Sequence, residues 1–159
     1  FALSAKNIHR QGNIQKGSTV SDYRKQEIKN QHSIGMSLLN FEFMEKKFNI
    51  VDTPGYTDFI GEMKAGLGVV ELAVIVVNAS EGIEVGTELA WEYSNNNNQS
   101  KVIIINMCNR DQSDFNKVLD SLKDRFGRQL FPITKPVNQG ENFNHKRKIF
   151  GENDVLSSL

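Results

Sequence analysis

The sequence predicts an α/β fold with a mostly parallel sheet, because apolar strands alternate with amphipathic helices along the chain. Residues 72–77 and 102–105 are continuously apolar, as is typical of parallel strands that are covered on both faces. We therefore expect these two segments to be central strands. Strands and helices in this order indicate βαβ units with right-handed crossovers.

The remaining elements follow from local patterns. Residues 36–43 and 48–51 are separated by the charged segment Glu45-Lys46-Lys47, which predicts a hairpin at one edge of the sheet. Three helices are expected, each with one apolar face. Their apolar faces consist of Phe59, Ile60, Met63, Leu67 and Val70; of Val85, Leu89 and Tyr93; and of Phe115, Val118, Leu119, Leu122 and Phe126. Gly127 is expected to end the third helix, and the polar residues 95–98 to form a helix-to-strand loop.

Composition limits the possible functions. The 159 residues contain 19 basic and 19 acidic side chains, so the formal net charge is zero and no basic field indicates direct, sequence-specific nucleic-acid binding. A single cysteine excludes an internal disulfide and is consistent with a reducing cytosol. No apolar stretch approaches the roughly 20 residues that span a membrane. We expect a cytoplasmic protein that does not bind membranes.

The segment Asp52-Thr53-Pro54-Gly55 directly follows the apolar strand 48–51. In one interpretation the Asp carboxylate holds Mg²⁺, usually through a water, while the glycine lets its backbone N–H approach a γ-phosphate. In the other, the four residues form an ordinary β-turn, because Pro presets φ and Gly permits positive φ. The motif by itself leaves both interpretations open.

The surrounding sequence resembles the translational GTPases, specifically elongation factor G and its close paralogues. Residues 51–62 are similar to their switch II, residues 17–23 and 33–39 to their switch I and the strand after it, and residues 74–84 to their next strand and loop. The resemblance implies a P-loop GTPase-type three-layer fold that binds the guanine nucleotides GTP and GDP with Mg²⁺. It also implies a monomeric factor that acts on the ribosome when complete.

The resemblance also implies roles for single residues. Asp52 and Ser33 would be metal ligands, with Ser33 keeping the hydroxyl of the family's switch I Thr. Asp52, Thr53, Pro54 and Gly55 would contact the nucleotide. Tyr56 occupies the position of the His that orients the attacking water in most translation factors. A phenol donates one hydrogen bond but cannot imitate imidazole at both nitrogens, so the replacement argues against hydrolysis more than against nucleotide binding.

Guanine recognition in this family uses the motif Asn-Lys-x-Asp after a buried strand. The matching residues here are Asn106, Met107 and Asn109, so that Asn is kept while Lys and Asp are replaced. A carboxylate accepts at both oxygens, whereas Asn109 offers one acceptor and one donor. We expect the affinity for guanine to be roughly tenfold to a few hundredfold lower than with the family's Asp at this position.

The phosphate-binding motif Gly-x-x-x-x-Gly-Lys-Ser/Thr does not occur in the sequence. Because Phe1-Ala2-Leu3 resembles the start of the helix that follows this loop, we expect a partial sequence in which the first strand and the P-loop are missing. Residues 1–137 are predicted to form a partial GTPase domain with switch I and switch II. Residues 138–159 are predicted to begin an inserted subdomain or to form a divergent tail.

Two functions follow from these observations. The first is a partial GTP-binding domain of an elongation factor G-like factor, which when complete couples GTP binding and hydrolysis to ribosomal translocation. The alternative is a degenerate pseudo-GTPase that acts as a binding module or is a non-functional remnant. Met107 and Asn109 are the residues that keep the alternative open.

Overall fold

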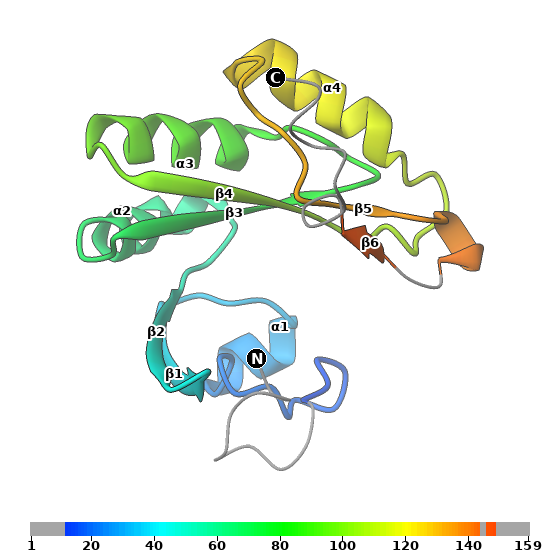
Figure 1. Cartoon of the computed structure of the whole chain (residues 1–159). Coiled ribbons are helices and arrows are strands. Elements are labelled where there is room, and N and C mark those ends of the chain that lie inside the picture. The colour runs from blue at the N-terminus through cyan, green and yellow to red at the C-terminus, as the bar shows by residue number, and fades with distance from the viewer. Residues whose placement is uncertain (1–11, 144–145, 149–159) are drawn as a thin grey trace. The chain divides into compact units, whose positions relative to one another are not determined.

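The structure, a computed structural model, describes residues 12–143 and 146–148. Its elements are shown in Figure 1. In chain order they are α1 (Lys25–Asn30), β1 (Ser37–Phe43), β2 (Lys46–Asp52), η1 (Thr57–Phe59), α2 (Ile60–Leu67), β3 (Leu72–Asn78), α3 (Val85–Asn96), β4 (Ser100–Asn106), α4 (Phe115–Phe126), β5 (Thr134–Pro136), η2 (Gly140–Asn142) and β6 (Lys146–Lys148). The chain divides into two compact units, one of residues 1–73 and 92–100 and one of residues 74–91 and 101–159.

The first unit contains the predicted hairpin. Strands β1 and β2 pair antiparallel from Ser37 opposite Asp52 to Phe43 opposite Lys46. The turn is Met44-Glu45, with φ of 48° and 60°, and Lys46 and Lys47 already belong to β2. The second strand therefore begins two residues before the predicted residue 48, and the turn is shorter than the charged segment suggested. Two successive residues at positive φ give a tight turn whose twist matches that of the strands.

Helix α2 in the first unit is held at its C-terminal end by Gln99. The side-chain amide of Gln99 donates hydrogen bonds to the carbonyl oxygens of Leu67 at 2.5 Å and of Val70 at 2.6 Å. The Leu67 carbonyl is one that the end of a helix leaves without an intrahelical partner, whereas Val70 lies three residues beyond the helix. Helix α2 ends at Leu67, so Val70, which was expected on its apolar face, lies beyond it.

In the second unit, α4 and the first part of α3, residues 85–91, cover one face of the parallel pair β3 and β4 (Figure 1). The buried residues of this core are Ile75, Val77, Val118 and Leu122. The amphipathic stripe of α4 is confirmed, and Gly127 caps its end with a φ of 117°. Asn95 and Asn96 still belong to α3, so the polar loop is shorter than predicted.

The opposite face of β3 and β4 carries exposed apolar side chains. Val74 is 51% and Val76 59% exposed, and Val102 and Ile104 in β4 are exposed as well. The prediction that both faces are covered therefore does not hold within residues 12–143, where burial alternates along β3 because only one face is packed. Each of the two strands also has a single partner in this part of the chain, so neither is central.

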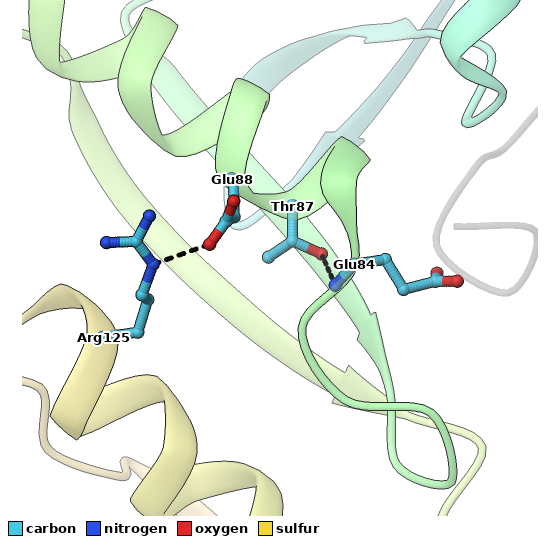
Figure 2. A network of polar contacts seen from close by, with 4 residues as sticks. All are labelled: Glu84, Thr87, Glu88 and Arg125. Carbon is cyan, nitrogen blue, oxygen red and sulfur yellow. Dashed lines mark hydrogen bonds and ion pairs between the residues drawn. The ribbon is translucent and has the colours of Figure 1, made fainter.

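Polar contacts connect α3 to α4 within the second unit (Figure 2). The Arg125 guanidinium donates through Nε to Glu88 Oε1 at 2.6 Å, and this ion pair raises the pKa of Arg125. Just before α3, the backbone N–H of Glu84 donates to the hydroxyl of Thr87 at 3.3 Å (Figure 2). The Glu84 contact satisfies a backbone donor at the start of the helix.

Strands β5 and β6 form a third, antiparallel pair. The predicted α/β class, with a parallel strand pair and helices, is confirmed. None of the helices in the described part of the chain is both long and apolar enough to cross a membrane.

Candidate functional site

The turn that follows β2 begins with a half-buried carboxylate and ends with an open glycine. Asp52 is the last residue of β2 and Pro54 is buried, whereas Gly55 and Tyr56 are exposed. A Cβ atom built on Gly55 would meet nothing within 4 Å. Packing within the described chain therefore does not require glycine at this position. The missing side chain instead leaves the backbone N–H open to approach by a ligand.

Ser33 lies in the segment just before β1 and contacts a second carboxylate. Its hydroxyl donates a hydrogen bond to Asp22 Oδ1 at 2.7 Å. A hydroxyl that donates its only proton keeps its lone pairs for accepting, so the oxygen of Ser33 has lone pairs available for a further partner. Asp22 was not among the residues predicted from the sequence, because no spacing rule connects a loop Asp to a Ser eleven residues later.

Asp22 also influences Asp52. Burial raises the pKa of the Asp52 carboxyl, a hydrogen bond with the Ser21 side chain lowers it, and the negative charge of Asp22 raises it further. The net effect is a raised pKa, so the ionised form of Asp52 lacks full compensation by neighbouring positive charge or hydrogen bonds. A cation beside the two carboxylates would supply this compensation.

The oxygen ligands in this cluster fit Mg²⁺ as it binds in nucleotide sites. Mg²⁺ prefers oxygen and is usually held by one or two carboxylates together with phosphates and waters. Asp52, Asp22 and Ser33 offer two carboxylates and a hydroxyl. Within the part of the chain that the structure describes, no group of three or more His, Cys, Asp or Glu residues could hold a metal. Two carboxylates and one hydroxyl would leave the remaining positions around a Mg²⁺ ion to waters and phosphate oxygens.

Glu27 organises the loop that carries Ser33. This buried carboxylate accepts the backbone N–H groups of Arg24 at 3.0 Å, of Ile34 at 3.1 Å and of Gly35 at 3.1 Å. Burial alone would raise the pKa of Glu27, but these three donors and the charge of Arg24 outweigh it, and the pKa is lowered. The Arg24–Glu27 spacing is that of a capping box, the one sequence signal for this role.

Tyr56 lies beside the residue that precedes Ser33. The rings of His32 and Tyr56 are 4.7 Å apart between centroids, at an interplanar angle of 52°. His32 also lies 6.4 Å from the ring of Phe59 in η1. The structure thus brings Tyr56 together with the loop of Ser33, although the two are far apart in sequence. Tyr56 is 58% exposed, so its phenol reaches solvent.

The predicted base-reading residues lie on one loop of the second unit. Asn106 ends β4, and Asn106, Met107 and Asn109 are all exposed, whereas Cys108 is buried. Met107 has a left-handed backbone with φ of 60°. The carbonyl of Cys108 accepts from the Ser113 hydroxyl and from the backbone N–H of Gly140, both at 2.9 Å. These bonds hold the loop so that its three candidate side chains face solvent.

The chain is similar to known proteins over most of its length. Residues 2–154 match the family described as "Elongation factor Tu GTP binding domain". The chain belongs to this family.

Several proteins are similar to the chain. It is 31% identical over 138 residues to "Elongation factor G-like protein" of Mycobacterium tuberculosis, which covers 87% of this chain and 19% of that protein. It is 32% identical over 142 residues to a protein of the same name from Thermotoga maritima, covering 89% and 21%. "Ribosome-releasing factor 2, mitochondrial" of Anopheles gambiae is 28% identical, over 92% of this chain and 19% of that protein.

A crystal structure of a Thermus thermophilus protein superposes on the chain with a TM-score of 0.82 and 25% identity, covering 89% of this chain and 21% of that one. The chain thus spans about a fifth of the length of the relatives it matches. Membership in the elongation factor Tu GTP binding domain family confirms the predicted resemblance to translational GTPases, and with it a guanine-nucleotide-binding class of domain.

Proposed function

We propose that the chain is the GTP-binding domain of an elongation factor G-like translation factor and binds GTP or GDP together with Mg²⁺. The observation that carries the proposal is the cluster of Asp22, Ser33 and Asp52 beside the open Gly55 turn. Carboxylate and hydroxyl oxygens that can bind a cation, next to an accessible backbone N–H, form the kind of site that a metal-bound phosphate requires.

Each residue of the turn has a distinct role in this proposal. Asp52 and Ser33 hold Mg²⁺, and Asp22 orients the Ser33 hydroxyl by accepting its proton in a hydrogen bond. Gly55 donates its backbone N–H to the γ-phosphate, while Thr53 and Pro54 shape the turn. Bound Mg²⁺ neutralises the charge of the β- and γ-phosphates. Tyr56 would orient the water that attacks the phosphate by accepting a hydrogen bond from it at the phenol oxygen.

The loop of Asn106, Met107 and Asn109 reads the base in this proposal. Asn106 anchors the loop at the end of β4, and the Met107 side chain lies against the purine face. Asn109 accepts one base N–H but turns a donor toward the other. Guanine is therefore bound more weakly than an Asp at this position would bind it.

We further propose that the complete factor acts on the ribosome, as a cytoplasmic monomer that couples GTP hydrolysis to translocation. The relatives that carry the names elongation factor G and ribosome-releasing factor 2 support this assignment. Direct, sequence-specific nucleic-acid binding and membrane binding are not part of it. Within the chain, residues 1–137 form the GTPase domain and residues 138–159 begin an inserted subdomain or a divergent tail.

A pseudo-GTPase is the second candidate, and the replaced base motif favours it. With Met107 in place of Lys and Asn109 in place of Asp, base selectivity is the first property to be lost. Such a protein keeps the fold and uses it as a binding module.

Nucleotide titration tests the proposal. The full natural polypeptide that contains residues 1–159 is titrated with fluorescent GDP, a non-hydrolysable GTP analogue and xanthosine diphosphate, each with Mg²⁺ and with EDTA. We expect Mg²⁺-dependent binding of the guanine nucleotides, which Asp52→Ala removes and Glu92→Ala, at an exposed acid on α3, leaves unchanged. Binding of none of the three would leave the pseudo-GTPase.

A further inference from the structure

Two carboxylates hold the backbone directly after Ser33. The N–H groups of the consecutive residues Ile34, Gly35 and Met36 all donate to side-chain carboxylates. Ile34 and Gly35 donate to Glu27 Oε1, each at 3.1 Å, and Met36 donates to Glu62 Oε2 at 2.7 Å. Hydrogen bonds to charged groups are shorter and roughly twice as strong as neutral ones. This segment is therefore fixed more firmly than an ordinary loop.

The two carboxylates come from different elements. Glu27 belongs to α1, which lies within the same loop region as Ser33. Glu62 belongs to α2, which follows the Asp52–Gly55 turn through η1 without a break. Glu27 thus stabilises the loop locally, whereas Glu62 connects it to the element on the other side of the turn.

Helix α2 is itself seated on the strand that leads into the turn. A Cβ atom on the buried Gly66 would come within 2.8 Å of Thr53 Cγ2 and 3.1 Å of Val51 Cγ1. The backbone of α2 therefore lies directly against the start of the turn. We expect a displacement of Thr53 to move α2 as well, because the two are in close-packed contact.

We propose that Glu62 is a positioning residue that couples the Asp52–Gly55 turn to Ser33 through α2. The inference rests on the proposed function and deepens it, because it names how the two halves of the metal and phosphate site act together. A γ-phosphate bound at Gly55 holds the turn and α2, and Glu62 in turn holds Met36 and the Ser33 hydroxyl in place. GDP has no γ-phosphate to hold the turn, so its binding depends on this connection less than that of GTP.

The test uses three variants of the full natural polypeptide. Glu62→Ala removes the acceptor and keeps a good helix former in α2. Glu62→Gln retains an oxygen that can accept the Met36 N–H. Glu92→Ala removes an exposed acid from α3 and controls for the change in net charge. Two quantities are measured: hydrogen exchange of the Met36 amide without nucleotide, and the affinities for a non-hydrolysable GTP analogue and for GDP in Mg²⁺.

We expect Glu62→Ala to speed Met36 exchange about tenfold and to lower the preference for the GTP analogue over GDP about five- to tenfold. GDP affinity should fall less than the affinity for the GTP analogue, Glu62→Gln should restore most of the preference, and Glu92→Ala should match the native protein. A merely structural role would weaken both nucleotides equally, and that result would overturn the inference. So would an unchanged preference in Glu62→Ala. If the native protein binds neither nucleotide, the proposed function fails first and the inference falls with it.

Discussion

The hydroxyl of Ser33 donates a hydrogen bond to Asp22 Oδ1 at 2.7 Å, so the lone pairs of its oxygen remain available to accept a further hydrogen bond or to bind a cation. Serine and threonine are equivalent in this respect, since each hydroxyl has one proton and two lone pairs. In the proposed site, this contact leaves the Ser33 oxygen available to the metal, as a threonine oxygen would be. In the same proposal, Asp22 supports the Ser33 hydroxyl without being one of the predicted ligands.

Ser33→Ala should weaken Mg²⁺-dependent binding of a GTP analogue by about tenfold or more, because a ligand to the metal is lost. Binding in EDTA should not change. Ser33→Thr, which restores the hydroxyl, serves as the matched control and should bind as the native protein does. Calorimetric titration at several Mg²⁺ concentrations checks this. Equal loss in Mg²⁺ and in EDTA would exclude Ser33 as a metal ligand.

Asp52→Asn should stabilise the nucleotide-free protein at neutral pH. The pKa of Asp52 is raised in the folded state, chiefly by burial, so folding favours the protonated form. Its contribution to stability is present below the unfolded pKa and is lost as pH rises through the folded pKa. A neutral amide removes this loss. The melting temperature should rise without Mg²⁺, while Mg²⁺-dependent nucleotide binding disappears, and a lower melting temperature in nucleotide-free buffer would contradict the prediction.

Glu27 should have the opposite effect on the pH dependence of stability. Its folded-state pKa lies below the ordinary value of 4.5, because backbone donors outweigh the cost of burial. Its stabilisation is therefore fully present above that value and is lost as pH falls through the folded pKa. Melting curves from pH 7 down to about pH 3 should show a steeper acid loss in the native protein than in Glu27→Gln. Glu92→Gln should follow the native curve.

Two glycines of α2 provide a matched pair. A Cβ on Gly61 meets nothing within 4 Å, so Gly61→Ala should stabilise the protein by about 0.5–1 kcal/mol through lower backbone entropy of the unfolded chain. Gly66→Ala should cost about 1–3 kcal/mol, because the added methyl meets Thr53 and Val51. Urea unfolding of both variants measures the difference. Equal effects at the two positions would mean that α2 is not seated on the turn.

Asn109→Asp should raise guanine affinity about tenfold or more, since a carboxylate accepts both base N–H groups. Asn109 is exposed, so the change should not alter the melting temperature. Competition between GDP and xanthosine diphosphate provides the measurement. A variant that gains no preference for guanine would show that Asn109 does not read the base.

Periodicity predicted the elements well where one pattern governs the local structure. The stripe from Phe115 to Phe126 gave α4 with its ending glycine, because amphipathic burial and Gly capping act together there. The hairpin was predicted, but its turn was misplaced. The turn at Met44-Glu45 needs positive φ at both residues, and neither Met nor Glu is a residue type that favours positive φ.

The candidate site was predicted only in part. The Asp52–Gly55 turn can be predicted from the sequence, because backbone geometry constrains its residue types. Asp22, Glu27 and Glu62 were missed, since each acts through a contact made by folding between distant residues. The Glu62 contact, for example, joins residues 26 positions apart. No spacing in the sequence predicts such a bond.

The exposed face of β3 and β4 has a practical consequence for all these measurements. Val74, Val76, Val102 and Ile104 present a β-branched surface to water in adjacent strands. Such a surface adsorbs hydrophobic dyes and promotes precipitation, and sulfate strengthens both effects because it is excluded from protein surfaces. Binding should therefore be measured with dilute protein in chloride buffers, and adsorption of the protein to the vessel should be checked. Under these conditions the binding curves report nucleotide affinity and not loss of protein.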